Sequence, residues 1–269
     1  MMGTGAQVRR LVAGGCLLAV LAGCASTSAA ARRGSGSSAP PSPTSAAATT
    51  ASTSPSPKPH PGYVFLDQDA SDRVTRWDPC AVLHYVVDPK GSPPGGMDDI
   101  RAAVGQLAEA TGIRFAFDGY VRERPSLRRA ELGREPPRPG RNPFKSVLVG
   151  WYSRGEAPAG TEDDVIGYAA PLYEFNGTQR VYVSGLVGIR RDADLPPGFD
   201  GNQSVGGVLL HELGHLMGLA HSIDDGQIMY YQSGHLSGPA RYRSGDLAGL
   251  RELGRSRGCL DTPLWERNR

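Results

Sequence analysis

Residues 211–221 read HELGHLMGLAH, and this stretch carries most of what the sequence says about fold and function. On an α-helix, His211 and His215 lie four residues apart, about 40° from each other around the axis, so both imidazoles can reach one metal ion. Glu212 projects about 100° from His211, which lets its carboxylate touch a water on that metal without being a ligand itself.

The same stretch ends the helix and supplies a third histidine. Gly218 lets the chain turn out of the helix at little steric cost, and the turn can bring His221 back as a third ligand. Three histidines with one open position make up the ligand set of a catalytic zinc rather than a closed structural one. The opposite helix face predicts a core stripe, formed by Val205, Leu209, Leu213, Leu216 and Met217.

The spacing HExxHxxGxxH resembles that of the metzincin zinc endopeptidases, in which a methionine turn follows the motif. Residues 227–231, QIMYY, are a candidate for that turn. In metzincins the methionine, here Met229, packs beneath the zinc site without binding the metal. Ser222, directly after the third histidine, is similar to the matrixin branch. The resemblance covers about residues 76 to 260, and only the stretch around the histidines is sharply specific.

The resemblance implies hydrolysis of peptide bonds in a protein or peptide substrate, at one catalytic zinc held by His211, His215 and His221. Glu212 would act as the general base that takes a proton from water and passes it to the leaving amine. A non-catalytic surface lipoprotein, which holds zinc and binds peptides or protein partners, is the alternative. Glu212 argues against this alternative, because a binder needs no base beside the metal.

Hydrophobic patterns along the rest of the chain fit an α+β domain. Strands are expected at residues 81–87, 114–117, 146–152, 166–173 and 180–186, and helices from a cap at Asp98 to Gly112, from about Asn202, and at residues 244–253. This order is similar to the metzincin catalytic domain. That domain has a mixed, twisted five-stranded sheet, three main helices and the methionine turn.

The resemblance makes the fourth of these strands the sheet edge that walls the cleft. An exposed edge offers unpaired N–H and C=O groups, to which an extended peptide can add as another strand. Pro171 lacks an N–H, so the substrate is expected to pair with the residues before it, Gly167, Tyr168, Ala169 and Ala170. An interior strand without substrate contact is the alternative. Tyr231 lies where astacin-type metzincins place a tyrosine that binds the transition state, and a core tyrosine is the alternative there.

The N-terminus indicates export. Arg9 and Arg10 precede an apolar run from Leu11 to Ala22, which is too short to span a bilayer and is typical of a signal peptide. The run continues into Leu21-Ala22-Gly23-Cys24, which matches the lipobox of bacterial lipoproteins. That resemblance implies cleavage before Cys24 and attachment of a lipid to its sulfur. A plain signal peptide that releases a free protein is the alternative.

Three regions follow from this interpretation: a lipoprotein signal peptide at residues 1–23, a tether at 24–62 and a zinc metallopeptidase domain at 63–269. The tether is rich in Ser, Thr, Ala and Pro and has no aromatic residue and no aliphatic one larger than alanine. Such a segment cannot bury enough apolar surface to offset its ordering entropy, so we expect disorder. The domain would be a monomer anchored to the outer face of a bacterial cell membrane, with shedding or secretion as the alternative.

Cysteine usage agrees with an exported protein. Cys16 leaves with the signal peptide and Cys24 would carry lipid, so Cys80 and Cys259 remain, near the two ends of the folded region. We predict a disulfide between them, with two free buried thiols as the alternative. Without the signal peptide the chain has 27 basic and 27 acidic residues. This balance gives no indication of a nucleic-acid partner.

The chain also departs from the matrixin pattern. It has no cysteine-switch propeptide, and no histidine- and aspartate-rich loop of the kind that holds a second zinc and calcium in animal matrixins. A few acidic loop residues could bind calcium but are more often merely solvated: Asp163, Asp164, Asp192, Asp194 and Asp200. Calcium therefore has no support from the sequence. The prediction of a catalytic zinc does not depend on the features that are missing here.

Overall fold

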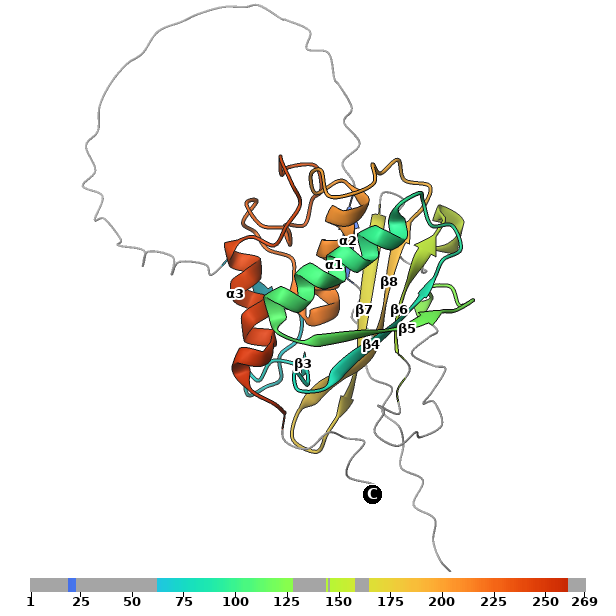
Figure 1. Ribbon diagram of the computed structural model, residues 1–269. Coiled ribbons are helices and arrows are strands. Elements are labelled where there is room, and N and C mark those ends of the chain that lie inside the picture. The colour runs from blue at the N-terminus through green and yellow to red at the C-terminus, as the bar shows by residue number, and fades with distance from the viewer. Residues whose placement is uncertain (1–18, 23–61, 128–143, 145, 158–164, 261–269) are drawn as a thin grey trace, which may run out of the picture. The chain divides into compact units, whose positions relative to one another are not determined.

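The computed structural model describes residues 19–22, 62–127, 144, 146–157 and 165–260. Cys24, Asp163, Asp164 and all of the expected tether except Gly62 lie outside the described residues. The described part is an α+β fold in which one curved sheet is covered on its concave side by helices (Figure 1).

The elements occur in the order that the sequence predicts, with four short additional strands. The strands are β1 (Ala19–Ala22), β2 (Val64–Phe65), β3 (Arg76–Trp77), β4 (Val82–Asp88), β5 (Arg114–Tyr120), β6 (Val147–Tyr152), β7 (Val165–Phe175), β8 (Arg180–Arg190) and β9 (Leu219–Ala220). The helices are α1 (Gly96–Thr111), α2 (Val205–Met217) and α3 (Ser244–Leu253), with single 3-10 turns η2 (Arg154–Glu156) and η3 (Arg255–Arg257).

The main sheet has the strand order β1-β7-β8-β6-β4-β5, and β3 also pairs with β8. Strands β5, β4, β6 and β8 run parallel, whereas β7 runs antiparallel to β8. These five long strands are the predicted mixed sheet, and β1 and β3 extend it. Every residue of β6 is buried, as expected of a central strand that is covered on both faces.

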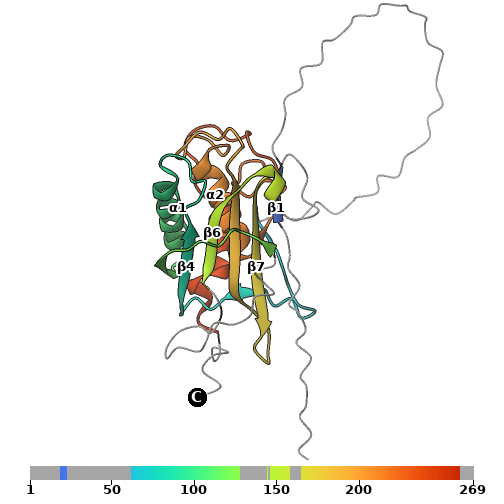
Figure 2. The same ribbon diagram turned by 90° about the vertical axis from the view of Figure 1, so that its right-hand side faces the viewer.

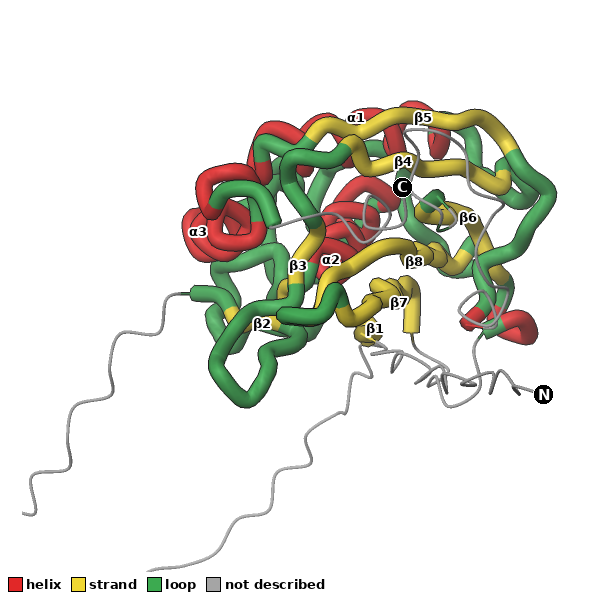
Figure 3. Tube along the Cα trace, turned by 90° about the horizontal axis from the view of Figure 1, so that it is seen from below, coloured by secondary structure: helices red, strands yellow, loops and turns green. Residues whose placement is uncertain are grey.

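Helix α2 lies inside the curve of the sheet, and α1 lies beside it (Figures 2 and 3). All thirteen residues of α2 are buried, because it packs against β7, β8 and α1. The predicted single apolar stripe therefore understates how enclosed the helix is. A smaller apolar cluster, formed by Leu148, Tyr152, Tyr168, Ala170 and Leu186, is separate from the main core.

Two helix starts differ from the prediction. The N-cap of α1 is Gly95, in a left-handed conformation with φ 79°, and Asp98 lies inside the first turn, so the predicted Asp98 cap is wrong. The glycine starts the helix earlier, since its carbonyl already accepts the N–H groups of Asp98 and Asp99. Helix α2 begins three residues later than expected, where the Ser204 side chain accepts the N–H of Gly207.

The predicted disulfide is present. Cys80 and Cys259 are bonded, with their Cα atoms 5.3 Å apart and a separation of 179 positions along the chain. The bond joins the start of β4 to the segment after η3. Within the part of the chain that the structure describes, no helix is both long enough and apolar enough to cross a bilayer.

Candidate metal centre

The three histidines expected to bind metal converge at the end of α2. One ligand atom from each of His211, His215 and His221 lies within 4.8 Å of the others. His221 reaches the group because Gly218 ends the helix in a left-handed conformation, with φ 114°, and β9 turns the chain back. Among the described residues, this histidine cluster is the one group of three or more His, Cys, Asp or Glu side chains spaced to hold a metal.

Backbone hydrogen bonds fix which ring nitrogens face each other. Nδ1 of His211 lies 2.8 Å from the carbonyl oxygen of Ile228, and Nδ1 of His215 lies 2.7 Å from that of Leu219. A carbonyl oxygen only accepts, so each Nδ1 carries the proton and each neutral ring presents a lone pair on Nε2. These two Nε2 atoms are 2.9 Å apart. Their lone pairs repel unless a cation lies between them.

Burial makes a proton a poor choice for that cation. Desolvation, together with the nearby His221, lowers the pKa of His211 from 6.5 to about 3. Burial also lowers the pKa of His215 well below its ordinary value, and it lowers the pKa of His221. The Nε2 atom of His221 is buried and has no hydrogen-bond partner. Three neutral, inward-facing imidazole nitrogens are the donor set that fits a zinc ion with three histidine ligands.

Glu212 lies on the same helix, against β7, the strand expected to form the sheet edge, which in the described residues has β1 on one side and β8 on the other. It is fully buried, and neither carboxylate oxygen has a hydrogen-bond partner. Burial raises the pKa of this carboxyl group well above 4.5. A Cβ atom on Gly167 of β7 would lie only 2.7 Å from Oε1 of Glu212, so a glycine is needed there. The expected base and the expected substrate strand are therefore in direct contact.

The predicted methionine turn packs against the helix between the two ligand histidines. Met229 is fully buried, and its sulfur occupies the space that a Cβ atom on Gly214 would need. The carbonyl of Met229 accepts the N–H of Ser222, 2.7 Å away, next to the third histidine. The turn thus touches both the helix and the segment that carries His221.

Asp246 holds this turn in place and was not identified from the sequence. Its carboxylate accepts the N–H groups of Ile228 at 2.8 Å and of Met229 at 3.2 Å. It also accepts the N–H of Arg243 at the start of α3, and burial raises its pKa to about 6. An acidic residue in the first turn of a helix is a readable capping signal. The contact between Asp246 and a turn 17 residues earlier in the chain cannot be recognised from the sequence.

The residues expected to bind substrate differ in their surroundings. Ala169 lies in the main core, whereas the side chains of Tyr168 and Ala170 belong to the smaller apolar cluster. The Tyr168 hydroxyl donates to the carbonyl of Pro125, 3.0 Å away, so this residue has only its backbone to offer at the edge. Tyr231 is 45% exposed, with its ring against Tyr230, which rules out the core position considered for it.

The acidic residues considered for calcium do not gather into a site within the described residues. Asp192 accepts the N–H of Arg154 and lies 3.8 Å from Arg190, and Asp200 forms a backbone bridge with Pro239. These contacts leave calcium without support from the structure.

Residues 159–253 match a family model described as Matrixin. These residues, which we call the matrixin segment, are thus similar to the matrixin metalloendopeptidases. The matrixin segment spans β7, β8, the histidine cluster and α3, which are the parts from which the site is built. The matched range includes the three histidines and residues 227–231.

Beyond the matrixin segment, similarity to known proteins is low. The metalloproteinase-II from Bacteroides fragilis is 13% identical to this chain, with a TM-score of 0.38 over 73% of this chain and 59% of that one. This chain thus spans less than two thirds of that structure, and so loose an overlap carries no argument about activity. No curated protein matches the sequence. The disulfide and the matrixin segment together suggest an extracytoplasmic protein.

Proposed function

We propose that this protein is a zinc-dependent endopeptidase that hydrolyses peptide bonds in proteins outside the cytoplasmic membrane. One observation carries the proposal: the Nε2 atoms of the buried His211 and His215 face each other, His221 adds an Nε2 atom without a partner, and the buried Glu212 lies on the helix of the first two. A zinc site for structure alone is closed by a fourth protein ligand. The described residues bring no fourth His, Cys, Asp or Glu ligand to this group.

The residues divide the chemistry between them. His211, His215 and His221 would hold the zinc through Nε2, and the carbonyls of Ile228 and Leu219 orient the two helix rings through Nδ1. When bound, zinc lowers the pKa of a water molecule and polarises the scissile carbonyl.

Glu212 takes the proton of the attacking water and delivers it to the leaving amine. Burial raises the pKa of its carboxyl group, which makes it a stronger proton acceptor than an exposed glutamate. Since its oxygens have no other partner among the described groups, they are available to the reacting water and amine.

The outer edge of β7 is where we place the peptide substrate. In the structure, Ala19–Ala22 pairs antiparallel with this edge, with Leu21 opposite Gly167 and Ala19 opposite Ala169. The edge can therefore take up an extended strand beside Gly167, which in turn touches Glu212. This supports substrate pairing at Gly167, Tyr168 and Ala169 through their backbones.

Two further residues, Ala170 and Tyr231, are proposed to contact the substrate. Ala170 lies one residue beyond the register of Ala19–Ala22, so a longer peptide would be needed to reach it. Tyr231 has an exposed ring, which leaves it open to a bound peptide.

We also propose that Cys24 carries a lipid that anchors the protein to the outer face of the membrane. The lipobox sequence supports this, and the Cys80–Cys259 disulfide agrees with an oxidising compartment. Mass spectrometry of the mature N-terminus tests the anchor. A lipid on Cys24 that disappears in Cys24→Ser, with release of the protein, is the expected result, and an unmodified N-terminus further along the chain contradicts it.

Digestion of an unbiased peptide library by the purified protein, read by mass spectrometry, tests the enzymatic proposal. We expect cleavage that requires zinc, stops with a chelator and is absent from Glu212→Ala. The cleaved sequences would give the subsite preferences at the same time. A folded, zinc-loaded protein that binds library peptides but cuts none would favour the alternative, a non-catalytic peptide-binding lipoprotein.

A further inference from the structure

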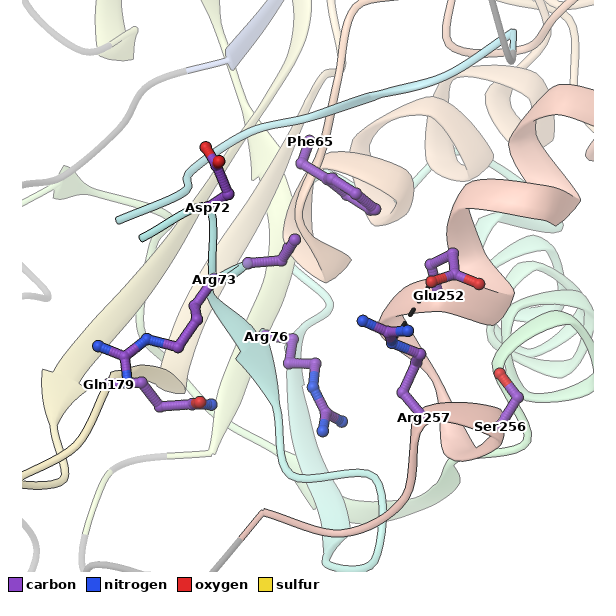
Figure 4. Close-up of a pocket in the computed structure, with 9 residues that line it drawn as sticks. Phe65, Asp72, Arg73, Arg76, Gln179, Glu252, Ser256 and Arg257 are labelled. Carbon is purple, nitrogen blue, oxygen red and sulfur yellow. Dashed lines mark ion pairs between the residues drawn. The ribbon is translucent and has the colours of Figure 1, made fainter. Parts of the chain in front are cut away.

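A cavity of about 450 Å³ opens between β3, α3 and the turn that joins β7 to β8. Its walls include Phe65, Arg76, Gln179 and Arg257, which come from four separate segments of the chain (Figure 4). None of these residues belongs to the histidine cluster or to the edge strand β7. We name this space the arginine cavity, because Arg73, Arg76 and Arg257 all line it.

The three arginines differ in their partners. Arg73 lies 2.8 Å from the carboxylate of Asp69, and Arg257 lies 3.4 Å from that of Glu252. Arg76 is different, since its Nη1 atom is buried and has no hydrogen-bond partner. In Figure 4 its side chain lies between those of Gln179 and Arg257. A buried guanidinium nitrogen without an acceptor leaves a strong donor unsatisfied.

The charged groups around Arg76 do not supply the missing acceptor. Burial lowers the pKa of Arg76, and the positive charge of Arg257 lowers it further. Asp78 acts in the opposite direction, but the structure places no ion pair between its carboxylate and Arg76 among the described contacts. Asp72 and Glu252 also line the cavity, but Glu252 pairs with Arg257, so among the described contacts Arg76 is the lining arginine without an ion pair. An anion beside Arg76 and Arg257 would be attracted by both.

We propose that the arginine cavity binds an organic anion through a carboxylate or phosphate group held by Arg76 and Arg257. A guanidinium group presents its N–H donors in a planar fork that matches the two oxygens of such a group. The cavity is within the size range of small-molecule sites, so it has room for more than the anionic group alone. The ring of Phe65 provides an apolar wall for the rest of the ligand (Figure 4).

The cavity adjoins the end of the zinc helix. Arg76 is followed by Trp77, whose indole N–H donates to the carbonyl of Leu216 in the last turn of α2, 2.8 Å away. Phe65 pairs with Leu219, just after that helix. A bound anion would therefore hold β2 and β3 against the C-terminal end of α2, so occupancy should raise the thermal stability of the whole protein.

Thermal unfolding of the full protein with inorganic phosphate or citrate, at ionic strength held constant with sodium chloride, tests the proposal. We expect a saturable rise in Tm with at least one of the two, and calorimetric binding at the same concentrations. A response to citrate alone identifies a carboxylate ligand, and a response to phosphate alone identifies a phosphate ligand. A folded protein whose Tm responds to neither overturns the proposal.

Substitution of Arg76 separates a built site from a general salt effect. Arg76→Gln should lose the response, and without anion its Tm should not fall, because the change removes an unsatisfied buried cation. Arg76→Lys keeps the charge but not the fork, and should weaken apparent binding about tenfold, the loss of one charge-assisted hydrogen bond. Arg251→Gln, on the exposed side of α3, is the matched control and should respond like the unchanged protein.

An equal response in the unchanged protein, Arg76→Gln and Arg251→Gln would overturn the proposal. If Arg76→Gln does not fold, Arg76→Lys serves as the test. A Tm response to anion in Arg76→Lys as strong as in the unchanged protein would also overturn the proposal. None of these measurements uses peptide hydrolysis, so they test the anion site independently of the proposed peptidase activity.

Discussion

The histidine cluster and the arginine cavity both contain buried nitrogen atoms without partners, but they call for opposite ligands. Burial keeps the histidines neutral, with the pKa of His211 at about 3, so their inward nitrogens offer lone pairs to a cation. Arg76 keeps its charge even when partly buried, so the N–H donors of its unpartnered Nη1 atom call for an anion. The same structural observation, an unsatisfied buried nitrogen, thus takes its meaning from the side chain that carries it.

The two regions also differ in how they are assembled. Two of the three histidines are on consecutive turns of α2, and the third follows after one glycine turn. The arginine cavity is assembled from segments between Phe65 and Arg257 that are far apart in the chain. A local motif can be read directly from the sequence, whereas a site of the second kind becomes visible only in three dimensions.

Glu212→Ala is the change with the largest expected effect, and it tests whether the histidine side of the comparison is catalytic. Removal of a general base lowers the rate by about 10²–10⁴-fold. The histidines remain, so zinc should still bind. Steady-state kinetics on a cleaved library peptide, together with the zinc content, measure both. Hydrolysis near the level of the unchanged protein would remove Glu212 from the mechanism, and loss of zinc would assign it a structural role.

A pH titration tests the histidine cluster, because its ligand nitrogens accept protons at low pH whereas arginine stays charged. The unfolded chain protonates histidine near pH 6.5, whereas folded His211 stays neutral until about pH 3. Its contribution to stability is therefore present above pH 6.5 and is lost as the pH falls through 3. Protons compete with zinc for the same nitrogens, so zinc should be released as the pH falls.

The raised pKa values of Glu212 and Asp246 act in the opposite direction, since their folded forms gain stability on protonation. Zinc retention, measured against a metal indicator from pH 7.5 downward, is therefore a cleaner readout than total stability. Arginine stays charged over this range, but citrate and phosphate take up protons as the pH falls, so the response to anion is compared at neutral pH. Zinc that stays bound at pH 3 would contradict the assignment of histidine ligands.

Asp246→Ala should destabilise the histidine cluster from a distance. The change leaves three buried or half-buried N–H groups, those of Ile228, Met229 and Arg243, without their acceptor. Each buried group left unsatisfied costs about 1–3 kcal/mol. We expect a lower free energy of unfolding and weaker zinc binding, because the Ile228 carbonyl orients His211. Asp246→Asn, which keeps an acceptor oxygen, is the control and should lose less stability.

Gly167→Ala tests the close contact between the edge strand and Glu212. The new methyl group would lie 2.7 Å from Oε1 of Glu212 and 2.8 Å from a Val208 methyl carbon, and such overpacking costs about 1–3 kcal/mol. We expect a fall in kcat/KM from displacement of Glu212, with zinc still bound. Gly105→Ala is the matched control, since nothing lies within 4 Å of its added Cβ. That change should stabilise α1 by about 0.5–1 kcal/mol.

The smallest expected effect is the change in Tm of Arg76→Gln without added anion. It compares directly the loss of a buried arginine with the loss of a histidine ligand. Removal of a histidine ligand leaves the other ligands without their cation, but removal of Arg76 relieves the cost of burying its charge, which outweighs the attraction of Asp78. We therefore expect a Tm equal to or above that of the unchanged protein in anion-free buffer. A clear drop in Tm would mean that Arg76 contributes to packing as an ordinary structural residue.

Much of the fold could be predicted because its signals are local. Helix α3 begins and ends where the pattern of Leu247, Leu250 and Leu253 predicts, and the five long strands lie where β-formers cluster. The error at the start of α1 has an equally local cause. Gly95 adopts a left-handed conformation that a capping pattern centred on Asp98 does not reveal.

The sequence by itself determined the chemistry of the proposed metal site, because two histidines four residues apart on a helix share one face whatever surrounds them. It also determined the disulfide, since only two cysteines remain in the folded region. Only the tertiary structure decided what surrounds these groups. The contact of Asp246 with the methionine turn, the space at Gly167 and the missing partner of Arg76 depend on segments that folding brings together. Burial and satisfaction of polar atoms belong to that packing, and no single stretch of the chain contains it.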